Sequence, residues 1–202
     1  MKKFAALLLC LCLLPLCTLA ETEENTALTV AMLNAELVFE PIKDGAVLTV
    51  ESDEAAFTSV GLNQEHMVFY MEAYGVHAMM FDDVMETEFQ VSANLTLEAD
   101  FDSLTEDEID QLCQDVRAYY ESVGCVVDSV EAYASAEGYV YIKTVSRYVY
   151  EDGYEEYTVE YYTCHGGYSV FVMVFPYDGA PTERQMDMGR EVVDSLHLIP
   201  VE

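Results

Sequence analysis

Apolar and polar positions alternate most regularly over residues 139–175, where two short breaks separate three apolar runs. The runs read YVYIKTVSRYVY, YEEYTVEYYTC and YSVFVMVF, and they are rich in the β-branched and aromatic residues that favour strands. The breaks contain Asp152-Gly153 and Gly166-Gly167, and glycine readily supplies the positive φ that tight hairpin turns need. This pattern predicts three consecutive antiparallel strands, and we expect the rest of the chain to cover or extend their sheet.

Two segments show apolar residues three and four positions apart, which is typical of amphipathic helices. In the first, residues 104–124, Thr105 and Glu108 fit a capping box. In the second, Thr182 and Gln185 form the same pattern ahead of the apolar positions. We therefore expect a long helix before the three strands and a final helix after them.

Shorter elements are predicted in the first half of the chain. The expected strands, together with one that follows the long helix, are residues 36–39, 46–50, 66–73, 76–81, 89–97 and 125–133. The first two strands should form an N-terminal hairpin around the turn PIKDG. Residues 53–60 should form a short helix capped by Ser52, and residues 27–33 are compatible with a short helix or a strand.

The order of these elements indicates the fold class. Strands linked by hairpins dominate, so the sheet should be antiparallel, with helices packed against it. The run YSVFVMVF is apolar at both phases of the alternation, which indicates that both faces of the sheet are covered there. The sequence thus predicts an α+β fold, an α/β/α sandwich with an antiparallel β-sheet and helices on both faces. We expect a single domain over residues 36–202, preceded by an N-terminal segment, residues 21–35.

The first 20 residues have the composition of a secretory signal peptide. Two lysines form a basic start, residues 5–16 are apolar, and the segment ends in TLA with a small residue. The apolar stretch is too short to span a bilayer, and we expect no membrane span elsewhere. We expect cleavage before Glu21 and a secreted, extracellular protein. Lipid attachment at Cys17 is the alternative, although Leu16 is larger than the residue that should precede such a cysteine.

Charge narrows the range of partners. The chain carries 38 acidic and 8 basic residues, which gives a net charge of −30. This balance argues against nucleic acid or anionic lipid as a partner, and it allows a protein or other ligand with a cationic surface, or divalent cations. It is also typical of a surface that keeps a secreted protein soluble and monomeric, so we expect a monomer.

The sequence contains no GxSxG, phosphate-loop or HExxH motif. Cys164 and His165 are adjacent, but neighbours in a strand point to opposite faces and make a poor nucleophile–base pair. Cys113, Cys125 and Cys164 follow the signal peptide, and their odd number leaves at least one thiol free. A disulfide between Cys125 and Cys164 is possible, but the sequence does not decide whether it forms. We expect a protein that is not an enzyme.

Tyrosine is concentrated in the three predicted strands, since nine of the 15 tyrosines lie between Tyr139 and Tyr168. Tyrosines that project from one sheet face would form an amphipathic surface suited to protein or glycan contact. The alternative is that tyrosine favours strands and pairs well across them. The glutamates among these rings would direct such a surface to a basic partner. The predicted contact residues are Tyr148, Tyr150, Tyr154, Glu155, Glu156, Tyr157 and Tyr161.

An acidic loop, DFDSLTED, precedes the long helix. Oxygen ligands at alternating positions suit a hard cation such as calcium. An EF-hand loop would need glycine and glutamate where Thr105 and Gln111 stand. Two interpretations stay open: an acid-rich helix start, or a calcium site formed by Asp100, Asp102 and Glu106.

The order of predicted elements, together with the closing VVDSLHL, resembles the PsbP-like superfamily over residues 36–198. The shared pattern is an N-terminal hairpin, a long helix, strands linked by turns and a closing helix. The resemblance implies an α/β/α sandwich on an antiparallel sheet. Known members act as binding or assembly factors with different partners, so it implies a module of this kind, and it identifies no site residues.

Overall fold

The structure is a computed structural model that describes residues 27–201. The predicted signal peptide and the alternative of lipid attachment at Cys17 lie outside the described residues.

Ten strands in two antiparallel sheets organise the described chain. The larger sheet has the order β3-β4-β5-β9-β8-β7-β6. Its strands are β3 (Ala46–Leu48), β4 (Val76–Phe81), β5 (Thr87–Leu95), β6 (Val126–Ala134), β7 (Val140–Val149), β8 (Glu155–His165) and β9 (Tyr168–Pro176). The smaller sheet has the order β1-β2-β10 and consists of β1 (Leu28–Ala31), β2 (Ala35–Phe39) and β10 (His197–Pro200).

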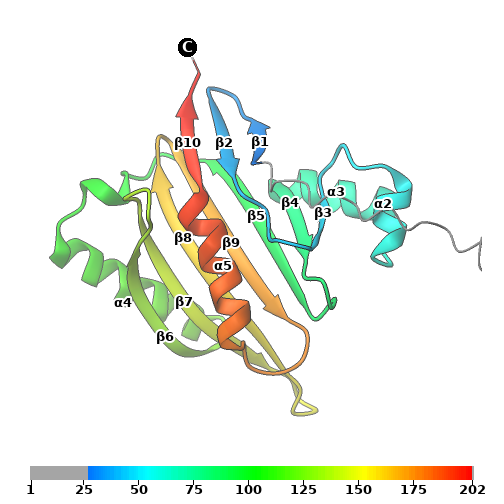
Figure 1. Cartoon of the computed structure of the whole chain (residues 1–202). Helices are drawn as coiled ribbons and strands as arrows, with labels where there is room; N and C mark the ends of the chain where they lie inside the picture. Colours follow the sequence, from blue (N-terminus) through cyan, green and yellow to red (C-terminus); the bar gives the residue numbers. More distant parts are fainter. Residues whose placement is uncertain (1–26, 202) are drawn as a thin grey trace, which may run out of the picture.

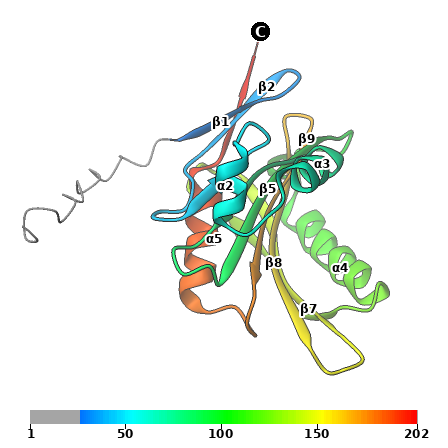
Figure 2. The same cartoon turned by 90° about the vertical axis from the view of Figure 1, so that its right-hand side faces the viewer.

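Helices cover both faces of the larger sheet (Figures 1 and 2). On one face lie α5 (Glu183–Ser195) and the smaller sheet. On the other lie α2 (Glu54–Ser59), α3 (Gln64–Tyr74), the 3-10 helix η2 (Phe101–Ser103) and α4 (Glu106–Ser122). The structure confirms the predicted α+β fold, with an antiparallel sheet between layers of helices.

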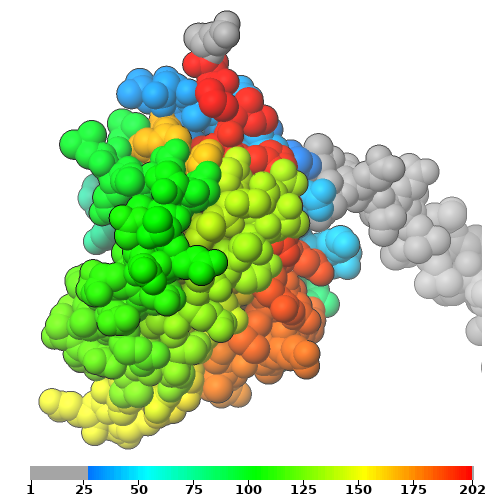
Figure 3. Space-filling view, turned by 90° about the vertical axis from the view of Figure 1, so that its left-hand side faces the viewer, coloured from blue at the N-terminus to red at the C-terminus, as the bar shows by residue number. Residues whose placement is uncertain are grey.

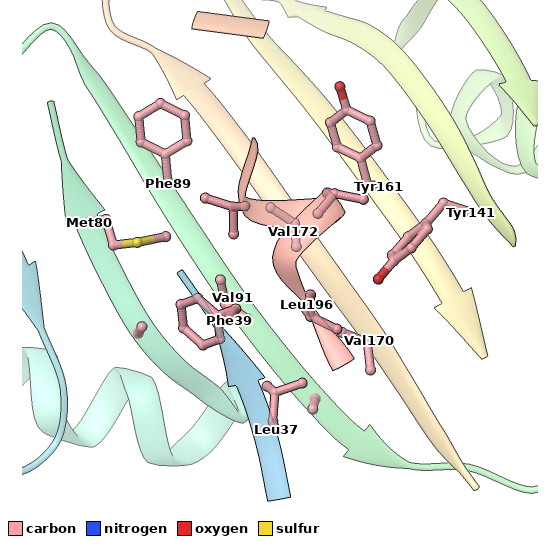
Figure 4. Packing of buried hydrophobic residues seen from close by; sticks show 14 of the residues in the cluster. Leu37, Phe39, Met80, Phe89, Val91, Tyr141, Tyr161, Val170, Val172 and Leu196 are labelled. Carbon is pink, nitrogen blue, oxygen red and sulfur yellow. The ribbon is translucent and has the colours of Figure 1, made fainter. Parts of the chain in front are cut away.

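The main core lies between the larger sheet and the layer that contains α5 (Figure 4). Val170 and Val172 of β9 pack there with Phe39 of β2 and Leu196, which follows α5. The other phase of β9, which includes Phe171 and Met173, is half-buried on the opposite face. Smaller clusters lie beneath α2 and α3 and beneath α4. Covering on both faces explains why β9 is apolar at both phases.

Both predicted capping boxes are present. The Thr105 hydroxyl accepts a hydrogen bond from the Glu108 amide, and the Glu108 carboxylate accepts one from the Thr105 amide at 2.8 Å. Thr182 and Gln185 make the same reciprocal contacts at the start of α5. The helix before the strands and the helix after them therefore begin where the sequence predicts.

The predicted strand at residues 66–73 is wrong, because residues 64–74 form α3. Asn63 caps the helix by accepting a hydrogen bond from the His66 amide at 3.0 Å, and Gly75 ends it with a left-handed φ of 64°. The apolar run HMVFYMEA is compatible with the period of a helix and with the alternation of a strand. The two caps distinguish the helix from a strand.

The predicted N-terminal hairpin is also wrong. β2 pairs with β1 and β10, whereas β3 pairs with β4 at the edge of the larger sheet. The intervening turn contributes Ile42 to the main core, and a Cβ on Gly45 would lie 2.4 Å from the Phe81 carbonyl oxygen. The backbone at Gly45 therefore packs closely against β4. The chain passes here from the smaller sheet to the larger sheet and does not form a hairpin.

Three smaller points concern one helix cap and two short strands. Asp53, not Ser52, caps α2, since its carboxylate accepts a hydrogen bond from the Ala56 amide at 2.8 Å. Residues 28–31 form a strand, one of the two alternatives predicted for residues 27–33, and pair with β2. Residues 197–200 form β10, which the sequence did not predict.

Candidate functional site

The β7–β8 hairpin ends in three exposed tyrosines, Tyr148, Tyr150 and Tyr154, termed the tip cluster below. The turn between these strands protrudes beyond α4 (Figure 3). The ring centroids of Tyr148 and Tyr150 lie 4.9 Å apart, and those of Tyr150 and Tyr154 lie 5.7 Å apart. About half of each side chain is exposed, with fractions of 44%, 43% and 52%. The three rings therefore form one accessible aromatic surface.

Glu156 adds a negative charge to the tip cluster. The sheet register pairs it with Tyr148, so both side chains lie on the same face of the hairpin. The Tyr150 hydroxyl donates a hydrogen bond to Glu156 Oε2 at 2.5 Å. This hydrogen bond raises the pKa of Tyr150, because an ionised phenol would lie against the carboxylate. The surface thus combines neutral phenol rings with a carboxylate.

Glu155 and Tyr157 lie on the opposite face of the hairpin. The Tyr157 hydroxyl donates a hydrogen bond to Glu155 at 2.9 Å, and Arg147 Nε lies 3.3 Å from the same carboxylate. Arg147 also pairs with Asp128 and lies over the Tyr157 ring, 5.7 Å from its centroid. Glu155 is therefore already paired within the chain, and the predicted contact residues are divided between two faces.

Tyr161 does not lie on either surface. It has an exposed fraction of 0% and lies in the main core (Figure 4), with its ring centroid 5.6 Å from that of Tyr133. Its assignment to the contact surface is wrong. Strand alternation places Tyr161 on the face of Tyr157, but this face is exposed at the hairpin end and covered by α5 further along.

The acidic loop brings Asp100 and Asp102 to the end of β8. His165 Nδ1 lies 3.2 Å from Asp102 Oδ1 and 3.9 Å from Asp100 Oδ2. Each of these three side chains offers one ligand atom, and the three atoms lie within 4.8 Å of one another. Glu106 is exposed in the first turn of α4 and is not in this group. The structure thus adds an imidazole nitrogen to the two predicted aspartates.

Cys164 lies beside this loop, but it is buried. Its Sγ lies 3.1 Å from the Tyr162 hydroxyl and donates a hydrogen bond to Glu98 at 3.4 Å. Burial raises the pKa of the thiol to about 11, so Cys164 is protonated near neutral pH. Cys113, Cys125 and Cys164 are all free, so the Cys125–Cys164 disulfide is not formed.

A pocket of about 410 Å³ lies beside α4, over β8 and β9. Its lining residues are Asp115, Val116, Tyr119, Tyr120, Glu160, Tyr162 and Phe171. Sequence reasoning missed this pocket because its residues come from one helix and two strands and meet only after folding. The one local signal is Glu160, a charged residue directly between Val159 and the aromatic pair Tyr161 and Tyr162.

Among the described residues, no helix has both the length and the apolar composition needed to cross a bilayer.

Comparisons with known proteins return similarity of structure alone. No family model matches the chain, and no curated protein matches its sequence. The solution structure of cyanobacterial PsbP (CyanoP) from Synechocystis is 14% identical, and the match covers 91% of this chain and 99% of that chain with a TM-score of 0.46. A crystal structure from Bacteroides thetaiotaomicron is also 14% identical, and the match covers 80% of this chain and 44% of that chain with a TM-score of 0.40.

A PsbP structure is thus among the matches. At this similarity the match concerns the arrangement of helices and strands. The class of protein is defined by the chain's own structure: an α+β domain with an antiparallel sheet between two helical layers.

Proposed function

We propose that this chain is a secreted, monomeric, non-enzymatic binding or assembly module that contacts a basic protein surface through the tip cluster and Glu156. The observation that carries the proposal is the exposed row of three tyrosine rings beside a carboxylate. Among the described residues, no lysine, arginine or histidine forms an ion pair with Glu156. Aromatic faces attract guanidinium groups, and carboxylates bind them through charge-assisted hydrogen bonds.

The surroundings of Cys164 and His165 favour binding over catalysis. A nucleophilic cysteine needs a lowered pKa, whereas burial raises the pKa of Cys164. The imidazole of His165, which would have to act as the base for this thiol, contacts Asp102 through Nδ1. Secretion is proposed from the predicted signal peptide, and the monomeric state from the net charge.

The test measures binding of a deca-arginine peptide to two variants of equal net charge. Glu156→Lys changes the charge beside the tip cluster, and Glu65→Lys makes the same change on the exposed side of α3. We expect Glu156→Lys to weaken binding about threefold to tenfold more than Glu65→Lys, because it removes a local carboxylate. Tyr150→Ser should add to the loss. Equal weakening by both lysine variants would show that net charge alone attracts the peptide and would refute the proposed surface.

The second candidate function is a calcium-dependent extracellular protein, for which the acidic loop is the proposed site. The observation that favours a metal is the convergence of Asp100, Asp102 and His165. Calcium takes oxygen ligands, whereas a nitrogen donor beside two carboxylates suits zinc or another transition metal better.

Thermal unfolding distinguishes the metals when it is measured with calcium, magnesium or zinc at matched ionic strength and with a chelator. A calcium site predicts a rise in Tm with calcium alone, lost in Asp100→Asn/Asp102→Asn and kept in His165→Gln. A site that uses the imidazole predicts a rise with zinc that His165→Gln abolishes. Equal small shifts with all three cations would indicate screening of the acidic surface and would exclude both.

A further inference from the structure

Glu160 of β8 places a carboxylate in the pocket beside α4. Its exposed fraction is only 8%, and its register partners on the neighbouring strands are Thr144 and Met173, which carry no charge. Glu160 Oε2 accepts a hydrogen bond from the Tyr120 hydroxyl at 2.8 Å. Within residues 27–201, no basic side chain forms an ion pair with Glu160. Because burial of a charge is costly unless it is paired, the carboxylate would be stabilised by a cation that enters the pocket.

Four aromatic rings line the same pocket. Tyr162 and Phe171 stack across adjacent strands, with centroids 4.7 Å apart and an interplanar angle of 11°. Tyr119 and Tyr120 of α4 meet edge to face, with centroids 5.6 Å apart. The rings of Phe101 and Tyr162 also meet edge to face, with centroids 5.0 Å apart. The aromatic lining therefore has fixed positions on two strands and a helix.

We propose that this pocket binds a quaternary ammonium group, with Glu160 as its counter-ion and the four rings as its walls. Aromatic faces attract cations, and clusters of such rings recognise quaternary ammonium groups. A quaternary ammonium suits these walls because it is weakly hydrated and has no N–H donor that needs an acceptor. A lysine ammonium has three donors to satisfy and is strongly hydrated.

Size and charge agree with a small organic cation. The volume of about 410 Å³ lies in the range of small-molecule sites, roughly 300–1,000 Å³. Asp115 adds a second carboxylate to the lining. The net charge of −30 raises the local concentration of any cation near the surface. The tip cluster takes no part in this pocket, so the inference goes beyond the proposed function.

The test uses choline as the probe and 3,3-dimethylbutan-1-ol, its uncharged isostere, as the control, with affinities measured by calorimetry. We expect choline to bind about tenfold or more tightly than the alcohol, because only choline pairs with Glu160 and the ring faces. Equal affinity for both molecules, or no choline binding at millimolar concentrations, would overturn the proposal.

Two variants locate the binding site. Glu160→Gln keeps an oxygen that can accept the Tyr120 hydrogen bond and removes the charge, so choline affinity should fall about tenfold. Tyr119→Leu removes a ring that is 63% exposed and can be changed without disturbing the core, and it should weaken choline but not the alcohol. Glu65→Gln, at an exposed position of α3 outside the pocket, should change neither. Unchanged choline affinity in both Glu160→Gln and Tyr119→Leu would refute the site.

A second arm distinguishes a free cation from a side chain of a protein. A peptide that contains Nε-trimethyllysine is compared with choline and with the same peptide carrying unmodified lysine. Tighter binding of the trimethylated peptide supports an ammonium group presented by a protein, and tighter binding of choline supports a free small molecule. Preference for unmodified lysine would contradict a site for quaternary ammonium groups.

Discussion

Glu160 has a carboxyl group whose surroundings oppose its ionisation. Burial raises its pKa, and the hydrogen bond from Tyr120 offsets only part of that effect. The folded chain therefore holds the Glu160 proton more tightly than the unfolded chain does. The resulting contribution to stability is present at pH values below the ordinary pKa of glutamate. It is lost as the pH rises through the raised pKa of Glu160.

This pH dependence can be measured with Glu160→Gln, which has no proton to lose. The free energy of unfolding of the variant, minus that of the wild type, should be larger at about pH 7 than at about pH 4, where an ordinary glutamate is largely protonated. Urea unfolding at the two pH values measures this difference. Exposed Glu156→Gln is the control and should show a much smaller change. A difference for Glu160→Gln that does not depend on pH would contradict the raised pKa.

Asp82 stabilises the turn between β4 and β5 through hydrogen bonds to the backbone. Asp82 is 2% exposed, and its Oδ1 accepts hydrogen bonds from the amides of Glu86 and Thr87 at 2.7 and 3.1 Å. Asp82→Ala leaves both amides without this partner and should lower the free energy of unfolding by about 2–4 kcal/mol. Urea unfolding provides the measurement.

The neighbouring Asp83 is the matched control for this prediction. Asp82 and Asp83 both contact Arg184, but Asp83 is exposed. Asp83→Ala removes one surface ion pair and should cost less than about 1 kcal/mol. Similar losses in the two variants would show that the pairing with Arg184, and not the backbone hydrogen bonds, gives Asp82 its importance.

At the scale of elements, the sequence predicted what local residues determine. α4 and α5 follow from capping boxes, and the β7–β8–β9 strands follow from alternation and turn glycines. α3 was mistaken for a strand because its apolar run lacks a clear period, although Asn63 and Gly75 mark its two ends. The pairing of β2 with β10 depends on distant residues, and no local pattern determines it.

Close packing of α5 on β9 depends on Gly189. A Cβ at this position would lie 2.7 Å from Val174 Cγ2, and Val174 is fully buried. Alanine favours helices by about 1 kcal/mol over glycine, yet Gly189→Ala should lower the free energy of unfolding by about 1–3 kcal/mol, because the stiff valine cannot move away. Denaturant unfolding measures the change.

The control for this prediction makes the same substitution in a Val174→Ala background. Removal of the Val174 methyl groups opens space for the new Cβ, so Gly189→Ala should there be neutral or stabilising. An equal loss in both backgrounds would mean that contact with Val174 is not the cause.

At the scale of the whole molecule, charge is the dominant property, with 38 acidic residues against 8 basic ones. Mutual repulsion of this kind favours the expanded chain. An increase in sodium chloride from about 0.01 M to about 0.1 M shortens the Debye length from about 30 Å to about 10 Å and should raise Tm. Potassium chloride should give the same shift. An unchanged or lower Tm would show that the acidic side chains are spaced widely enough not to repel one another.

Charge and tyrosine content were visible in the sequence, but the surfaces that they form were not. The predicted contact residues separate into the tip cluster with Glu156, the pair Glu155 and Tyr157, and the buried Tyr161. The pocket around Glu160 needs α4 to lie across β8 and β9, and nothing local indicates that position. Long-range packing therefore determined the candidate sites more than composition did.

The smaller sheet has a consequence for the order in which this protein can be assembled. β2 is its central strand, and Leu37 of β2 pairs with Leu198 of β10. During synthesis, β2 leaves the ribosome long before the residues that must lie beside it, so one of its edges stays open. Open strand edges pair readily with other chains. β10 thus covers an edge of β2 that would otherwise stay open until the end of the described chain has been made.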